Sequence, residues 1–194
     1  MPPRRKQDHH GRRARREGYP ARSVYKLQEI DRRLGLLKKG QRVLDLGASP
    51  GSWTLYAAER VGQAGRVLGI DLEGADVALP PQAEIRALDA FEVDPTSLGG
   101  PFDLVISDMA PKTSGQRHAD QYRSYELVMR ALELAKAVLL PGGAFVAKIF
   151  QGAEFEQARD AFRAVFDKVR IIRPQATRDE SYEVFLVGLG FRAT

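Results

Sequence analysis

Four acidic residues, each at or near the end of a short apolar run, have the placement that most directly predicts chemistry. They are Asp45, Asp71, Asp89 and Asp108. Short apolar runs of this kind predict buried parallel strands, and in open α/β sheets ligands bind at the carboxyl ends of the strands. Aspartate also favours strand ends and turns for local reasons, which could explain one or two of the four. Together they predict a crevice for a ligand with hydroxyl groups, an amine and positive charge, a description that S-adenosylmethionine fits.

A lysine inside another apolar run is the second candidate for chemistry. Lys148 lies within residues 144–150, where burial of its charge is costly unless it is paired or functional. A lysine near a strand end can also extend its ammonium to solvent. We expect Lys148 to reach the crevice beside Asp108 and to act as a general base. Burial favours the neutral amine that a base needs and a nearby carboxylate opposes it, and the sequence leaves open which effect dominates.

A glycine turn separates the first apolar run from the helix predicted to begin at Ser52. Gly47 and Gly51 bracket this turn, with Pro50 between them. Strand, glycine turn and helix N-terminus together direct backbone N–H groups at a nucleotide-sized ligand. The full Gly-x-Gly-x-x-Gly pattern is absent, which argues against a pyrophosphate and for an uncharged or zwitterionic ligand. Asp71 follows at close to the offset of ~20 residues expected of an acid that binds a ribose.

Predicted strands and helices alternate along the chain. Besides the four acid-ending runs, strands are predicted at 144–150, 168–172 and 182–189, and helices at 52–58, 122–140 and 155–165. This alternation predicts a mostly parallel sheet with helices on both faces. No helix separates the last two runs, which predicts an antiparallel hairpin at the C-terminal edge. The expected fold is therefore α/β and Rossmann-like, with a mostly parallel seven-stranded sheet.

Composition excludes several classes of protein. The 194 residues are enough for one domain and contain no cysteine, which excludes disulfides, thiol nucleophiles and cysteine-bound metal. The histidines His9, His10 and His118 lack the spacing of a metal site, so no metal is expected. Neither a membrane-length apolar segment nor a signal-peptide pattern is evident. We expect a soluble cytoplasmic protein without a membrane partner.

Positive charge is concentrated at the N-terminus. Residues 1–17 hold seven lysines and arginines against two acids, which matches the net charge of +5 of the whole chain. A basic segment joined to a neutral domain favours a polyanion partner, because neutralising phosphates releases counterions. A disordered solubilising tail is the alternative. We expect 1–17 to be a flexible RNA-binding arm and a helix to follow it, and the residues expected to contact RNA are Arg12, Arg13, Arg15, Arg16, Arg22 and Lys26.

Taken together, these motifs resemble the FtsJ/RlmE family of S-adenosylmethionine-dependent ribose 2′-O-methyltransferases. The similar stretches are 22–27, 43–53, 107–111, 146–152 and 181–185, in the family's order. The resemblance implies a class I methyltransferase domain over 18–194 with S-adenosylmethionine as cofactor. It implies a catalytic set of two lysines and two acids. Lys148 is the expected base and Asp108 orients it, while Lys26 and Glu183 position the ribose and the amine of the base.

The resemblance also implies the cofactor contacts. Together with Gly47 of the glycine turn, they are Gly51, Trp53, Asp71, Asp89 and Asp108. Two details depart from the pattern common in this family. Ser49 and Ser52 replace an alanine and a glycine, which are similarly small, and the segment after Asp71 lacks the usual Met-Pro-type loop.

A basic arm on a compact domain resembles the family members that methylate a uridine ribose in large-subunit (23S-type) ribosomal RNA. The expected partner is therefore ribosomal RNA within the large subunit, bound by a monomer. Three alternatives remain: a transfer RNA ribose methyltransferase of the same family, a non-catalytic RNA-binding ribosome-assembly protein, and a small-molecule methyltransferase. A pure binding protein would need basic surface but no lysine within an apolar strand, and the arm argues against a small-molecule substrate.

Overall fold

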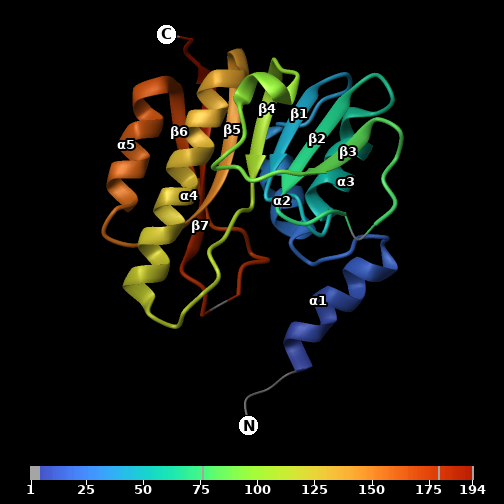
Figure 1. The fold of residues 1–194 in the computed structure, drawn as a ribbon. Coiled ribbons are helices and arrows are strands. Elements are labelled where there is room, and N and C mark those ends of the chain that lie inside the picture. The colour runs from blue at the N-terminus through green and yellow to red at the C-terminus, as the bar shows by residue number, and fades with distance from the viewer. Residues whose placement is uncertain (1–4, 76, 179, 194) are drawn as a thin grey trace.

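The computed structural model of the chain describes residues 5–75, 77–178 and 180–193, without the side chains of 5–8 (Figure 1). A seven-stranded sheet has the order β3-β2-β1-β4-β5-β7-β6. Its strands are β1 (Arg42–Leu46), β2 (Arg66–Asp71), β3 (Ala83–Ala87), β4 (Phe102–Ser107), β5 (Leu139–Phe150), β6 (Phe166–Ile172) and β7 (Glu183–Phe191). The helices are α1 (Arg5–Arg16), α2 (Val24–Leu34), α3 (Ser52–Val61), α4 (Arg117–Val138) and α5 (Phe155–Val165), with a 3₁₀ turn η1 (Pro95–Leu98).

Strand direction changes only at the C-terminal part of the sheet. The strands from β3 to β5 pair in parallel, whereas β7 runs antiparallel to both β5 and β6. The predicted seven-stranded, mostly parallel sheet with an antiparallel C-terminal pair is confirmed. Within that pair β6 forms the edge, and β7 is inserted between β5 and β6. Within the described residues, no helix has the length and apolar character needed to cross a membrane.

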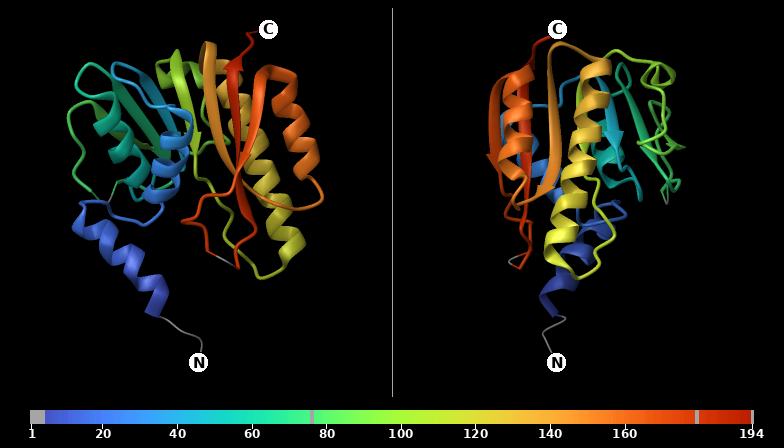
Figure 2. Two further views of the ribbon diagram at one scale, coloured as in Figure 1. Left: turned by 180° about the vertical axis from the view of Figure 1, so that it is seen from behind. Right: turned by 60° about the vertical axis from the view of Figure 1, so that its left-hand side comes forward.

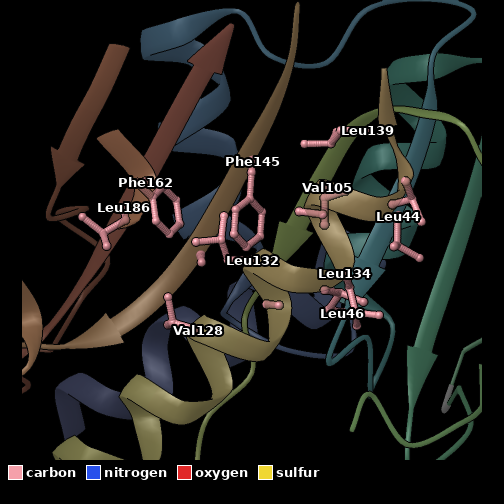
Figure 3. Close-up of a cluster of buried hydrophobic side chains, with 14 of the residues drawn as sticks. Leu44, Leu46, Val105, Val128, Leu132, Leu134, Leu139, Phe145, Phe162 and Leu186 are labelled. Atoms are coloured by element: carbon pink, nitrogen blue, oxygen red, sulfur yellow. The ribbon is translucent and has the colours of Figure 1, made fainter. Parts of the chain in front are cut away.

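Helices cover both faces of the sheet, as Figure 2 shows from two sides. On one face α2 and α3 bury Leu27, Trp53 and Ala57 against the central strands. On the other face α4 and α5 bury a larger cluster centred on Phe145 (Figure 3). Phe145 is fully buried and stacks on Phe162 of α5, with ring centroids 5.1 Å apart. Both faces of β1, β2 and β4 are therefore largely buried, which explains why these strands are nearly continuous apolar runs, whereas the edge strand β3 is more exposed.

The boundary between α4 and β5 differs from the sequence prediction. The helix begins at Arg117 and ends at Val138, and β5 begins at Leu139 and runs through residues 141–143, which were expected to separate the two elements. Leu139 pairs with Phe102 of β4, and the register then shifts before Leu104 pairs with Ala144. This irregularity accommodates the proline and glycines within the strand.

The basic arm contains a regular helix, α1, where the sequence predicted no element. Its last turns are attached to the domain, because the buried Ala14 packs with Tyr19 and Val24. The guanidinium of Arg13 lies 5.0 Å from the ring centroid of Tyr25. The Tyr19 hydroxyl donates a hydrogen bond to Glu59 of α3 at 2.5 Å. These contacts fix the direction in which α1 leaves the domain, beyond the edge of the sheet at which β4 ends (Figure 1).

Candidate active site

Lys148 and Asp108 meet at the carboxyl ends of β4 and β5. These strands are parallel neighbours in which Ser107 pairs with Ala147, so the next residue of each lies at the same level. The Lys148 Nζ donates a hydrogen bond to the Asp108 carbonyl oxygen at 2.7 Å and lies 3.0 Å from Asp108 Oδ1. The Lys148 side chain is only 7% exposed. The lysine within the apolar strand is thus paired, next to the acid that the sequence placed beside it.

Lys26 and Glu183 form a second pair on the same face of the sheet. Glu183 begins β7 and pairs across the ladder with Phe150, two residues along β5 from Lys148. Residues two apart in a strand point to the same face, so Glu183 and Lys148 are diagonal neighbours. Lys26, from α2, forms an ion pair with Glu183 Oε1, and both side chains are largely buried. The fold therefore brings together all four residues of the expected catalytic set.

The glycine turn after β1 has the geometry that a close approach requires. Gly47 has φ of 77°, and a Cβ there would lie 2.6 Å from Met109 Cγ. Gly51 has φ of 110° at the N-cap of α3. The first N–H groups of α3 have no intrahelical acceptor and are available to a ligand. Both glycines are therefore required by backbone conformation and by space.

Asp71 supports this turn directly. Its Oδ2 accepts a hydrogen bond from Ser49 N at 3.0 Å, and its Oδ1 accepts one from Glu73 N at 3.1 Å. Asp89 lies just beyond β3 and is exposed, and its Oδ1 accepts a hydrogen bond from Phe91 N at 2.8 Å. Both carboxylates are at the carboxyl edge of the sheet, as the sequence predicted, and both also shape the loops around them.

Asp45 and Trp53 have surroundings that differ from the sequence expectation. Asp45 is fully buried within β1 and does not line the open crevice. Its Oδ2 accepts a hydrogen bond from the Thr54 hydroxyl at 2.7 Å, and burial raises its pKa to about 7. The Trp53 indole is also buried and donates to the Ser23 carbonyl oxygen at 2.9 Å. A ligand in the crevice can therefore meet the backbone of Trp53 but not its ring.

Two exposed apolar side chains at this edge were not singled out from the sequence. Leu72 is 72% exposed and Phe91 is 49% exposed. Leu72 directly follows Asp71, and Phe91 lies two residues after Asp89. Large apolar groups beside polar ligand-binding groups are typical of sites that hold a flat organic ring. The sequence pattern that could have identified Leu72 and Phe91 is their position just after two of the strands that end in an acid.

The six residues expected to contact RNA fall into two groups. Arg12, Arg13, Arg15 and Arg16 are exposed on α1. Arg22 and Lys26 lie at and just inside the start of α2, where both are half-buried. Arg22 donates to the Ala176 carbonyl oxygen at 2.9 Å, which ties it to the loop between β6 and β7. Positive groups thus extend from α1 to Lys26 and Lys148.

Comparisons with known proteins agree with this geometry. Residues 19–191 match the family of FtsJ-like methyltransferases. The ribosomal RNA large subunit methyltransferase E of Sorangium cellulosum is 56% identical over 182 residues, which cover 93% of this chain and 86% of that relative. The protein of the same name from Oleidesulfovibrio alaskensis is 50% identical over 190 residues, with 95% and 92% covered. A crystal structure of a ribosomal RNA methyltransferase from Plasmodium falciparum has a TM-score of 0.79 at 25% identity, covering 91% of this chain and all of that one.

The sheet order, the antiparallel β7 and the helices on both faces define the class I methyltransferase fold. Lys148, Lys26 and the glycine turn lie at the carboxyl edge, where this class of fold binds its ligands. The chain belongs to the FtsJ-like methyltransferase family, which matches nearly its whole length. It is therefore a methyltransferase.

Proposed function

We propose that this protein is an S-adenosylmethionine-dependent methyltransferase that modifies a uridine ribose 2′-oxygen in large-subunit ribosomal RNA, as a monomer in the cytoplasm. The observation that carries the proposal is that two ion pairs, Lys148–Asp108 and Lys26–Glu183, lie close together on one face of the sheet. The relatives from Sorangium and Oleidesulfovibrio, both named as large-subunit ribosomal RNA methyltransferases, support the choice of substrate.

The residues at the sheet edge fit S-adenosylmethionine. Among the described residues, the Asp108 Oδ1 atom is buried and accepts no hydrogen bond, although the Lys148 Nζ lies 3.0 Å from it. A carboxylate oxygen with remaining acceptor capacity suits a ligand with positive charge. When bound, S-adenosylmethionine supplies an electrophilic methyl group. Two sets of groups would bind this cofactor: the backbone of Gly47, Gly51 and Trp53, and the carboxylates of Asp71, Asp89 and Asp108.

The two lysines have separate tasks in the proposed mechanism. A ribose hydroxyl is a poor nucleophile, so a base must remove its proton. Lys148 is placed for this role, because the hydrogen bond to the Asp108 carbonyl fixes its Nζ at the crevice. Its Nζ would accept the 2′-hydroxyl proton and remain as an ammonium beside the Asp108 carboxylate. Asp108 thereby both orients the amine and stabilises the charge that forms.

Lys26 and Glu183 position the ribose. Their ion pair gives one donor and one acceptor at a fixed spacing, which matches the hydroxyl groups of a sugar. Holding hydroxyl and methyl in near-attack geometry can lower the barrier by roughly 7–11 kcal/mol at the limit. The arm of residues 1–17 adds affinity by neutralising phosphates, and its helix α1 directs that charge past the edge of the sheet.

Methyl transfer from labelled S-adenosylmethionine tests the proposal. The substrates are large ribosomal subunits, free ribosomal RNA and transfer RNA, and the variants are Lys148→Ala and Lys168→Ala. Lys168 lies exposed on β6 of the same sheet and serves as the matched control. We expect label at a ribose 2′-oxygen of the large subunit with wild type and Lys168→Ala, and none with Lys148→Ala, whose cofactor binding persists.

Other outcomes would contradict particular parts of the proposal. Label only on transfer RNA would assign the chain to the related transfer RNA methyltransferases. Cofactor binding without transfer to any RNA would favour a binding or assembly protein. Full activity of Lys148→Ala would exclude Lys148 as the base.

A further inference from the structure

Lys26 and Glu183 line one part of a cavity of about 480 Å³, and the mechanism above does not use the other residues of its wall. Residues distant in sequence form its walls. Arg22 lies just before α2, Phe150 ends β5, and Arg178 and Tyr182 lie between β6 and β7. The volume is within the range of small-molecule binding sites, which is about 300–1,000 Å³. The cavity is therefore large enough to hold a nucleobase next to the residues proposed to bind the ribose.

One wall of this cavity is aromatic. The rings of Phe150 and Tyr182 meet edge to face with centroids 4.9 Å apart. The guanidinium of Arg117, from the start of α4, lies 5.1 Å from the Tyr182 ring centroid. Unpaired RNA bases are recognised by stacking on aromatic rings and guanidinium planes. Tyr182 contacts both of these groups and also lines the cavity, so part of its ring is available to a base.

Two guanidinium groups, those of Arg22 and Arg178, also line the cavity. Arg22 is anchored by its hydrogen bond to the Ala176 carbonyl oxygen. Burial and then the positive charge of Arg178 lower the pKa of Arg22, while Glu183 and Glu180 oppose this effect. Among the described residues, neither arginine forms an ion pair with a carboxylate. Two close cations without such a partner are suited to a phosphate group.

The depth of the catalytic residues restricts how a nucleotide can reach them. The side chains of Lys148 and Lys26 are only 7% and 13% exposed. A ribose held within a stacked helix lies beside its neighbours and cannot enter such a recess without them. Enzymes that modify nucleotides solve this by taking the target out of the stack into a pocket. Here the pocket next to the recess is the one lined by Tyr182.

We infer that this cavity receives the base of an unstacked target nucleotide, stacked on Tyr182, with Arg22 and Arg178 at the flanking phosphates. The inference rests on the proposed function, because it concerns the nucleotide whose ribose faces Lys148. It assigns Tyr182, Arg22 and Arg178 to substrate binding, and it predicts that the enzyme recognises the target base as well as its ribose.

Methyl transfer to two kinds of large subunit tests this inference. One carries the natural ribosomal RNA, and the other is assembled in the same way from RNA with an abasic ribose at the methylated position. The variants are Tyr182→Ala, Tyr182→Phe, and Tyr122→Ala as a control at an exposed tyrosine of α4 outside the cavity. Cofactor binding by each variant is measured in parallel.

We expect Tyr182→Ala to lower kcat/KM about tenfold on natural subunits, from the loss of one base–ring stack, through a higher KM. Tyr182→Phe and Tyr122→Ala should match wild type. On abasic subunits Tyr182→Ala and wild type should be equal, because no base is present to stack. An equal loss on both substrates would show that Tyr182 acts only through the fold, and no loss on natural subunits would place the base elsewhere; either result overturns the inference. Absence of transfer by the wild type would instead overturn the proposed function, and this inference with it.

Discussion

Replacing Asp45 by asparagine should change how the stability of this protein depends on pH. The carboxyl is fully buried, and burial raises its pKa from 3.8 to about 7, with the charges of Asp108 and Asp71 adding to the effect. The Thr54 hydroxyl opposes it by donating to Oδ2. A difference of about three pH units between the folded and unfolded pKa corresponds to about 4 kcal/mol.

The direction in which stability changes with pH depends on whether the folded or the unfolded chain keeps the Asp45 proton. Well below pH 4, Asp45 is protonated in both the folded and the unfolded state, so its carboxyl does not make stability depend on pH. Between about pH 4 and 7 the unfolded chain ionises while the folded one keeps its proton, so the wild type loses stability as the pH rises. Asparagine has no such titration, and its side-chain oxygen can still accept the Thr54 hydrogen bond. The advantage of Asp45→Asn should therefore grow by about 3 kcal/mol between pH 5 and pH 8.

Urea unfolding of both proteins at pH 5, 6, 7 and 8, without cofactor, measures this difference. Asp94→Asn is the matched control, because Asp94 is exposed and the Thr96 backbone N–H lowers its pKa. Its difference from wild type should not grow with pH in this range. A difference between Asp45→Asn and wild type that is the same at pH 5 and pH 8 would refute the reasoning.

Three further predictions concern the turn, the core and the arm. Gly47→Ala should lower the free energy of unfolding by about 1–3 kcal/mol and weaken cofactor binding in calorimetry, because φ is positive and Met109 is in the way; normal binding would contradict this. Phe145→Ala should cost about 3–5 kcal/mol in urea unfolding, since the ring is fully buried, and a loss below 1 kcal/mol would show that the site collapses. Tyr19→Phe removes the hydrogen bond to Glu59 and should speed trypsin cleavage within α1, while an unchanged cleavage rate would show that this bond does not hold the arm.

Much of the fold could be predicted because its strands are buried on both faces. Apolar runs such as those around Leu44 and Val105 have only one stable place, the interior of a parallel sheet. The pairing of Lys148 with Asp108 followed from the same logic, since neighbouring parallel strands end at one edge. The insertion of β7 between β5 and β6 could not be predicted from the sequence, because an apolar run does not specify which strand it will pair with.

Other features depended on contacts that no local pattern contains. Helix α1 is polar along most of its length, and its attachment depends on Tyr19 reaching Glu59, 40 positions away. The orientation of the Trp53 ring depends on the Ser23 carbonyl and on Phe185 of β7. The cavity lined by Tyr182 arises only where four separate segments meet. In each case the deciding partner is remote in sequence.

The interior position of β7 has a consequence for the order in which activity arises. Glu183 opens this strand, and its partner Lys26 lies 157 positions earlier in the chain. Contacts of such large separation form late in folding, because the intervening chain must first be ordered. Until β7 enters between its neighbours, β5 and β6 have open edges and Lys26 has no carboxylate beside it. A partly folded chain would therefore lack the Lys26–Glu183 pair that we propose binds the ribose, and this pair forms in the same event that completes the sheet.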